Sequence, residues 1–183
     1  MIKIVIISSS IRDQRNSHMV SLFFRNYLEE TKLADTEILD LKEFNFPLFT
    51  ERLRYLKDPP SAVLEFAGKI EKSDGVIIIT PEYNGGYPAS LKNVIDLLYK
   101  EWDRKPVGIA TVSDGIFGGS QVITSLQFVL WKMKARVITE RFLVPNVVKN
   151  FDEKGHPFDK EATDKRASVF IKELIKCAEE NKK

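Results

Sequence analysis

Residues 75–98 read GVIIITPEYNGGYPASLKNVIDLL and join a short apolar run to a helical pattern through a glycine-rich loop. The run from Gly75 to Ile79 contains no polar side chain, which is typical of a β-strand covered on both faces. After Pro88, apolar residues recur at helical spacing at Leu91, Val94, Ile95 and Leu98. The segment therefore predicts a buried strand, a loop and an amphipathic helix.

The same alternation of strand and helix extends along the whole chain. Strands are predicted at 3–7, 37–41, 75–79 and 107–112, and a fifth begins at 136–139. Helices are predicted at 17–30, at 59–70 with Asp58 as its N-cap, at 88–98, at 122–130 and around 170–178. Segments 42–56 and 143–160 are expected to be irregular. This order predicts an α/β fold, and five strands at this length suit a flavodoxin-like three-layer sandwich with parallel strand order 2-1-3-4-5.

Length and composition narrow the class of protein. A chain of 183 residues fits a single domain over 1–183, and 43% apolar with 30% charged residues is an ordinary globular balance. The net charge of +2 is too weak to indicate nucleic acid or an anionic membrane as a partner. No segment approaches the ~20 apolar residues of a membrane helix. The lone Cys177 favours the cytoplasm, and with two histidines a metal site is not expected.

The loop after the first strand, Ser8 to Ser17, reads SSSIRDQRNS. In a sheet of this order, ligands bind beyond the carboxyl ends of the strands, between the first and third strands. Hydroxyls and two arginines beside a helix N-terminus favour an anion there. A single phosphate is the simplest guest, because the loop has neither the lysine of a P-loop nor a GxGxxG motif. The alternative is a polar surface loop capped by Ser17.

Two further loops should meet the first one at the same edge of the sheet. Residues 80–88, TPEYNGGYP, combine two glycines, which let a flat ring approach the backbone, with the aromatic face of Tyr83. A glycine–proline turn with incidental aromatic residues is the alternative for this loop. Residues 113–120, SDGIFGGS, place three glycines just before a helix, which suggests another close backbone approach.

These residues resemble the NADPH-dependent FMN reductase family, which has a flavodoxin-like fold. Residues 81–96, PEYNGGYPASLKNVID, are similar to the signature of that family almost throughout. The first loop resembles its phosphate loop, the glycines after Ser113 resemble its third loop, and Asp40-Leu41 with 46–48 resembles its segment after the second strand. The resemblance runs from about Ile2 to about Leu130, and Ser9 departs from it because glycine is usual at that position.

The resemblance implies a cofactor, an electron donor and a set of contacts. It implies FMN as cofactor, NADPH or NADH as donor, and a free flavin, quinone, azo compound or metal oxyanion as acceptor. It also implies a homodimer or homotetramer. The implied FMN contacts are Ser10, Arg12, Asn16 and Ser17 for the phosphate, Pro81, Glu82, Tyr83, Asn84 and Gly85 for the isoalloxazine, and Ser113, Gly115, Gly118 and Gly119 at its far edge.

Some side chains in these loops keep several interpretations. Arg15 can touch the FMN phosphate, reach the 2′-phosphate of NADPH, or be solvated. Glu82 resembles a general base, but pairing with an arginine of this or a neighbouring subunit is the preferred hypothesis. His18 can line the rim. Serine at position 9 is costly if that residue needs a positive φ.

No catalytic side chain is predicted, because FMN carries the chemistry and the protein orients it. The main alternative is a flavodoxin-type electron carrier that does not oxidise a nicotinamide. Such carriers tend to be strongly acidic for docking, and the net charge of +2 disfavours one. A phosphate-binding module without redox chemistry is disfavoured by Tyr83 between proline and glycines, which suits a planar ring.

Overall fold

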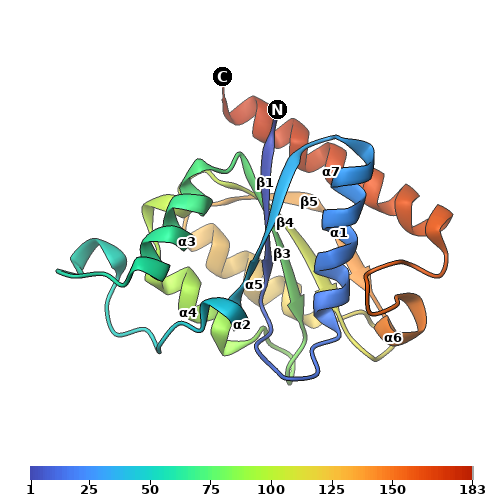
Figure 1. Ribbon diagram of the computed structural model, residues 1–183, viewed down its shortest axis with the longest axis horizontal. Helices are drawn as coiled ribbons and strands as arrows, with labels where there is room; N and C mark the ends of the chain where they lie inside the picture. Colours follow the sequence, from blue (N-terminus) through green and yellow to red (C-terminus); the bar gives the residue numbers. More distant parts are fainter. Residues whose placement is uncertain (183) are drawn as a thin grey trace.

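A computed structural model describes residues 1–182 and shows a parallel five-stranded sheet between two layers of helices (Figure 1). The strands are β1 (Lys3–Ser8), β2 (Asp35–Asp40), β3 (Gly75–Pro81), β4 (Pro106–Val112) and β5 (Arg136–Val144). The α-helices are α1 (Ser17–Thr31), α2 (Leu41–Phe44), α3 (Ser61–Lys72), α4 (Ala89–Leu97), α5 (Gln121–Lys132), α6 (Val147–Asn150) and α7 (Lys160–Asn181), with 3-10 turns at Leu53–Tyr55 and Lys100–Trp102. The order β2-β1-β3-β4-β5 confirms the predicted flavodoxin-like fold.

The unbroken apolar run of β1 follows from burial on both faces of the sheet. Ile4 and Ile6 pack into one core with α1 and α7, whereas Val5 and Ile7 pack into the other with α3, α4 and α5. Successive strand side chains point to opposite faces, so a strand between two helical layers has no polar face. Both cores are therefore anchored on the same central strands.

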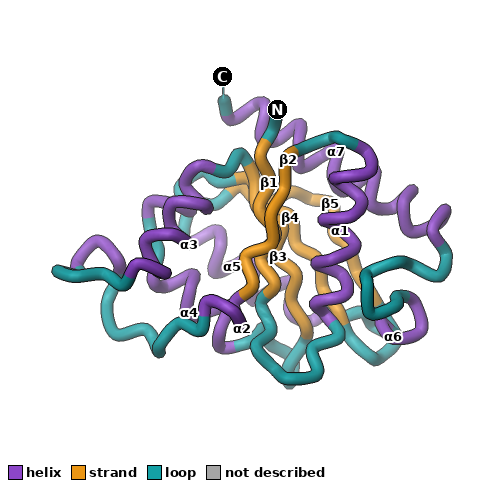
Figure 2. The backbone as a smooth tube through the Cα atoms, in the orientation of Figure 1, coloured by secondary structure: helices purple, strands orange, loops and turns teal. Residues whose placement is uncertain are grey.

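The two helical layers leave one end of the sheet open for a site. Figure 1 shows α1 and α7 on one side of the sheet and α3, α4 and α5 on the other. The two termini lie together at one end, and Figure 2 shows the loops that follow β1 and β3 at the opposite end. The carboxyl ends of the parallel strands thus share one edge, as the predicted binding site requires.

The close packing of α7 against the sheet requires a residue without a side chain at Gly108 in β4. The ring of Phe170, which is fully buried, lies against this residue, and a Cβ at position 108 would be 2.5 Å from its Cζ atom. Phe170 also contacts Phe24 and Phe142, with ring centroids 5.4 Å and 6.0 Å apart. An aromatic cluster therefore joins α1, β5 and α7.

The edge strand β5 bulges in its first half. The pairing with β4 shifts between Val107 and Ile109, and the carboxylate of Glu173 on α7 accepts hydrogen bonds from the backbone N–H groups of Thr139 and Glu140, each at 3.0 Å. Burial acts to raise the pKa of Glu173, but the bonds from Thr139 and Glu140 outweigh it, and the pKa is lowered. The ionised carboxylate thus completes the hydrogen bonding of the bulge.

Several boundaries differ from the sequence predictions. Segment 42–56 is not wholly irregular, because α2 spans Leu41–Phe44 and a 3-10 turn spans Leu53–Tyr55. The second strand begins at Asp35 and ends at Asp40. The third helix begins at Ser61 without a side-chain cap, so the predicted Asp58 cap is wrong; Pro59 precedes another proline, which keeps it out of the helical region. Segment 143–160 is not wholly irregular, because β5 continues to Val144 and α6 follows.

Within the described chain, no helix combines the length and apolarity needed to cross a membrane.

Candidate FMN and nicotinamide site

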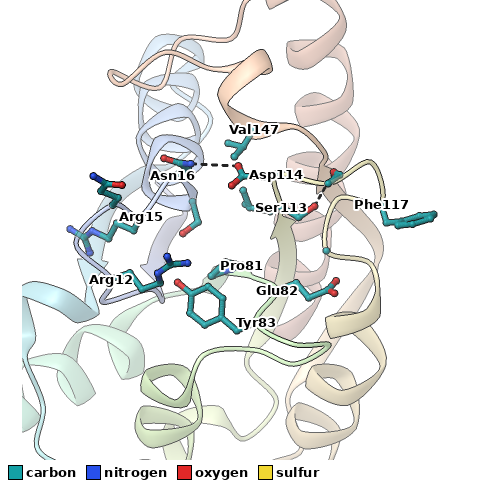
Figure 3. Close-up of a pocket in the computed structure, with 15 residues that line it drawn as sticks. Arg12, Arg15, Asn16, Pro81, Glu82, Tyr83, Ser113, Asp114, Phe117 and Val147 are labelled. Carbon is teal, nitrogen blue, oxygen red and sulfur yellow. Dashed lines mark hydrogen bonds between the residues drawn. The ribbon is translucent and has the colours of Figure 1, made fainter.

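A cavity of ≈ 380 Å³ lies at the carboxyl edge of the sheet, where the three predicted loops meet (Figure 3). This volume falls within the range of ordinary small-molecule sites. Its lining comes from the loop after β1, the loop after β3, the loop after β4 and one residue of α6. The lining residues are Arg12, Gln14, Arg15, Asn16, Ser17, Pro81, Glu82, Tyr83, Val112, Ser113, Asp114, Gly115, Phe117, Gly119 and Val147.

Ten of the fourteen predicted site residues line this cavity, and four do not: Ser10, Asn84, Gly85 and Gly118. Five lining residues were missed: Gln14, Val112, Asp114, Phe117 and Val147. Four of these lie inside the predicted loops or directly next to one, so their positions in the sequence could have identified them as lining residues. Val147 had no such signal, because it comes from the segment expected to be irregular.

The first two loops are joined by a contact between Ser10 and Tyr83. Their hydroxyl oxygens are 2.6 Å apart, and the Ser10 side chain is therefore engaged with Tyr83. The guanidinium carbon of Arg12 lies 5.5 Å from the centroid of the Tyr83 ring. Figure 3 shows the Arg12 guanidinium above this ring on the cavity side. Among residues 1–182, Arg12 makes no ion pair, so its positive charge is available at the cavity.

Arg15 has a partner that sequence reasoning did not identify. Its guanidinium forms a two-pronged ion pair with Asp40 at the end of β2, and it donates a hydrogen bond of 3.1 Å to the carbonyl oxygen of Ser10. The side chain of Asp40 is 3% exposed and that of Arg15 is 14% exposed. Arg15 is therefore not solvated, and its charge is largely neutralised by Asp40. Its structural role is to tie the first loop to β2.

His18 lies beneath the same loop, next to this ion pair. Its Nδ1 atom is 3.0 Å from the hydroxyl oxygen of Ser8 and 3.7 Å from a carboxylate oxygen of Asp40. Burial and the positive charge of Arg15 lower the pKa of His18, with a further small lowering from Arg25, although Asp40 and Glu43 act in the opposite direction. The folded protein therefore favours the neutral imidazole.

The lowered pKa of His18 predicts a pH dependence of stability. Below its ordinary pKa of 6.5, the unfolded chain takes up a proton that the folded chain resists. The contribution of His18 to the free energy of unfolding should therefore be complete above about pH 6.5. It should be lost as the pH falls from there through the lowered pKa of the folded protein. Urea unfolding at pH 7.5 and pH 5.5 measures this loss, which His18→Gln should reduce. An equal loss in this variant and in the exposed-site control His156→Gln would contradict the prediction.

Serine at position 9 is accommodated without backbone strain. Ser9 lies outside the left-handed region, so the departure from glycine needs no positive φ. Its backbone N–H donates to the carbonyl oxygen of Ile79 at 3.2 Å, and its carbonyl oxygen accepts from the hydroxyl of Ser90 at 2.6 Å. These two bonds hold the end of β1 against β3 and α4.

The second loop is a two-residue turn that holds Tyr83. Tyr83 and Gly86 exchange backbone hydrogen bonds of 2.8 Å and 3.1 Å. Asn84 and Gly85 between them have φ values of +53° and +80°, the sign that this tight hairpin turn requires at both positions. Asn84 and Gly85 therefore shape the loop from outside the cavity, and their turn presents Tyr83 to it.

The third loop is packed against the ends of β4 and β5. A Cβ at Gly118 would meet Leu143 Cβ at 3.1 Å, and one at Gly119 would meet Thr111 Cβ at 3.2 Å. At these two glycines, the backbone of the loop therefore approaches the protein's own strands closely. At Gly115, by contrast, a Cβ would meet Ser113 Oγ at 3.9 Å and nothing closer, which leaves the backbone there open to the cavity.

The segment after β5 closes the cavity through its backbone. The N–H of Asn146 donates to the carbonyl oxygen of Gly115 at 3.1 Å, and the N–H of Val147 donates to that of Ser113 at 3.2 Å. Asn146 adopts a left-handed conformation with φ +44°, which turns the chain back towards the third loop. These bonds place Val147 in the lining.

Comparison with known proteins identifies the family. Residues 2–149 match the family model described as NADPH-dependent FMN reductase. The chain belongs to this family. An NAD(P)H-dependent FMN reductase of Saccharomyces cerevisiae is 34% identical over 149 residues, which cover 74% of this chain and 77% of the relative. A quinone reductase of Escherichia coli is 34% identical over 110 residues, 58% of each chain.

A solved structure shares the fold of this chain. The flavoenzyme NAD(P)H:(acceptor) oxidoreductase from Paracoccus denitrificans superposes with a TM-score of 0.79 at 22% identity, covering 96% of this chain and 98% of that one. At this identity the likeness supports the fold alone. Family membership makes the chain an oxidoreductase with FMN and NAD(P)H as its cofactors.

One residue of the family signature has a structural role outside the cavity. The side-chain amide of Asn93 on α4 donates to the carbonyl oxygen of Pro47 at 2.8 Å and accepts from the N–H of Phe49 at 2.6 Å. The two bonds hold the segment after α2 against α4. Sequence reasoning assigned no role to Asn93, because the partner segment has no regular structure.

Proposed function

We propose that FMN binds in this cavity with its phosphate at the first loop. The observation that carries the proposal is the pairing of an available guanidinium, Arg12, with an aromatic ring, Tyr83, at the carboxyl edge of the sheet. The N-terminus of α1 adds partial positive charge, and Asn16 at its N-cap position makes no side-chain capping bond. Asn16 and Ser17 both line the cavity and can meet the phosphate oxygens, since the side-chain amide of Asn16 makes only a long contact of 3.5 Å to Asp114.

The residues of the second and third loops suit a planar ring. Pro81, Glu82 and Tyr83 line one side of the cavity, and Ser113 and Gly115 line the other. The open backbone at Gly115 admits a flat group without a side-chain clash. Asn84 and Gly85 support the ring face through the turn, and Gly118 and Gly119 fix the far edge by their packing.

When bound, FMN supplies the chemistry of accepting an electron pair from NAD(P)H and passing it to a small acceptor. The protein's part is to bind, orient and shield. The N–H groups of the glycine-containing loops can stabilise developing negative charge without titrating. Among residues 1–182, Glu82 pairs with no arginine, so the preferred pairing would involve a neighbouring subunit.

The acceptor, the assembly and the compartment complete the proposal. The acceptor is a flavin, a quinone, an azo compound or a metal oxyanion, of which the first two match the names of relatives. The exposed rings of Phe128 and Trp131 lie 5.8 Å apart on α5, and an apolar pair on an outer helix supports a homodimer or homotetramer. The single free thiol of Cys177 supports a reducing, cytoplasmic setting. One FMN-binding domain over 1–183 is supported by the single sheet on which both apolar cores are built.

The absorption spectrum of the purified protein tests the proposed function. A yellow protein that releases FMN on denaturation and is bleached anaerobically by NADH or NADPH is the expected result. FMN that binds tightly but is reduced by neither nicotinamide would support the electron carrier instead. A protein that binds no flavin would contradict both functions.

Replacing Arg12 with alanine should weaken FMN binding by about 1.5–3 kcal/mol, the value of a hydrogen bond to a charged group. The cause is loss of the available guanidinium at the proposed phosphate position. Fluorescence titration of the apoprotein with FMN measures the change, and riboflavin should show almost no difference because it has no phosphate. Arg141→Ala on the exposed edge of β5 is the matched control. Unchanged FMN affinity in Arg12→Ala would refute this placement of the phosphate.

A further inference from the structure

The proposed phosphate position offers less positive charge than the phosphate carries negative charge. A phosphate monoester has a charge of about −1.5 to −2 at pH 7. Arg12 brings one positive charge, and the N-terminus of α1 adds roughly half of one. The carboxylate of Asp114 opposes them, since one of its oxygens lies 3.5 Å from the side-chain amide of Asn16. A bound phosphate is therefore short of about one positive charge.

A second source of charge lies beneath the first loop, where Asp40 faces two basic side chains. Arg15 forms the two-pronged ion pair with Asp40, and the Nδ1 atom of His18 lies 3.7 Å from a carboxylate oxygen of the same residue. Figure 3 shows Arg12 extending towards Tyr83 and Arg15 on the outer side of the same loop. With a neutral His18, the group of Asp40, Arg15 and His18 has no net charge. With a protonated His18, the same group has one positive charge.

The charges that face His18 come from four parts of the chain. Arg15 lies on the first loop, and Arg25 lies on α1 itself. Asp40 ends β2, and Glu43 belongs to α2. Burial and Arg15 lower the pKa of His18, with a smaller lowering by Arg25, and the two carboxylates that raise it do not outweigh them. Because two cations face two carboxylates, a further negative charge nearby shifts His18 towards its protonated form.

In the proposed function, the phosphate of FMN supplies such a charge. Its proposed partner Ser17 directly precedes His18, and consecutive Cα atoms are only about 3.8 Å apart. The imidazole therefore lies within roughly 10 Å of the phosphate, a distance over which charges still interact in 0.1 M salt. His18 is not among the residues that line the cavity, so the phosphate acts on it by charge rather than by contact. The side chain of His18 is 27% exposed, so a proton can reach it from the solvent.

We propose that His18 is a positioning residue for the cofactor phosphate and takes up a proton from the solvent as FMN binds. The inference rests on the proposed FMN site and adds a residue from outside the cavity lining. The proton gives the group of Asp40, Arg15 and His18 its net positive charge, and this charge compensates the phosphate across the first loop. FMN binding and protonation of His18 are then linked, and each favours the other by the same factor.

The linkage has a defined direction with pH. FMN raises the pKa of His18 above its value in the apoprotein. The contribution of His18 to FMN affinity is therefore complete below the lowered pKa of the apoprotein. It is lost as the pH rises through the pKa of the FMN-bound protein.

Proton NMR of the imidazole rings tests the proposal on the wild-type protein. The chain contains two histidines, His18 and His156, so His156→Gln assigns the two ring Cε1–H signals. The titration midpoint of His18 should move to higher pH when FMN is bound. The midpoint of His156 should move much less, because its side chain is 64% exposed and faces Asp152. Riboflavin, which has no phosphate, should leave the His18 midpoint in place.

Affinity measurements test the same linkage through its effect on binding. Fluorescence titration of the apoprotein with FMN, in buffers without phosphate, gives dissociation constants for wild type and His18→Gln. Glutamine can still bond to the hydroxyl of Ser8, the partner of His18 Nδ1, but it cannot take up a proton. The ratio of the constants, variant over wild type, should be roughly three- to tenfold larger at pH 6.0 than at pH 8.5, the scale of a partly screened charge interaction. The ionisation of the FMN phosphate cancels in this ratio, and His156→Gln should match wild type at both pH values.

The outcomes separate this proposal from the function on which it rests. A His18 midpoint that FMN leaves unchanged or moves to lower pH would overturn the proton uptake while leaving the FMN site intact. An affinity ratio that does not change with pH would overturn it as well. If His18→Gln fails to fold, the wild-type midpoint alone decides. A protein that binds no FMN would instead contradict the proposed function.

Discussion

Replacing Asp40 with alanine should lower the free energy of unfolding by about 3–4 kcal/mol. The change removes the partner of Arg15 and leaves a guanidinium in a largely buried setting, where an unpaired charge is costly. It also removes the hydrogen bond from the Lys42 N–H that caps α2, which is 3.0 Å long. Urea unfolding monitored by circular dichroism measures the loss, and FMN affinity should fall as well because the first loop is no longer held.

Asp13→Ala is the matched control for this prediction. Asp13 pairs with Lys42 in the same region, but its side chain is 98% exposed, so its loss should cost at most about 1 kcal/mol. The double variant Arg15→Met with Asp40→Leu should recover part of the stability by removing both charges. Equal effects of Asp40→Ala and Asp13→Ala would show that the buried pair does not hold the loop.

Replacing Gly155 with alanine should lower the free energy of unfolding by about 3–5 kcal/mol. Gly155 has φ +79°, and a Cβ there would lie 2.6 Å from the backbone N of Phe23 and 2.7 Å from the carbonyl oxygen of Met19. The contacts are with the backbone of α1, which cannot rotate away as a side chain can. Left-handed strain of about 1–3 kcal/mol and overpacking of similar size therefore add. Thermal and urea unfolding measure the effect.

Gly68→Ala is the control of opposite sign. Gly68 lies inside α3, and a Cβ there would meet nothing within 4 Å. Alanine should therefore stabilise the protein by about 0.5–1 kcal/mol through helix propensity. If both glycine variants lost stability to the same extent, the packing of Gly155 against α1 would not be the cause.

The fold could be predicted because the apolar pattern of each strand and helix is visible in the sequence. Strands such as 75–79 are apolar throughout because helices cover both faces, and this pattern survives in the sequence alone. The boundaries that were predicted wrongly depend on the conformation of adjacent residues. The start of α3 depended on two adjacent prolines, and the end of β5 depended on the return of the chain at Asn146.

The candidate site was predictable as loops but not as pairs of side chains. Parallel strands bring their carboxyl ends to one edge, so the three loops could be placed together from their order. The pairing of Arg15 with Asp40 joins residues 25 positions apart and depends on where β2 ends beside the first loop. Val147 lines the cavity because its backbone N–H donates a hydrogen bond to Ser113, and a bond between backbone atoms cannot be predicted from the types of residue.

The bulge of β5 has a consequence for how copies of this protein can meet. An open sheet edge offers unpaired N–H groups on which a further strand can grow, and edge-to-edge pairing of this kind leads to aggregation. The Glu173 carboxylate occupies the N–H groups of Thr139 and Glu140, and the irregular register bends the edge away from straight pairing. Sheet extension through this half of β5 is thereby blocked.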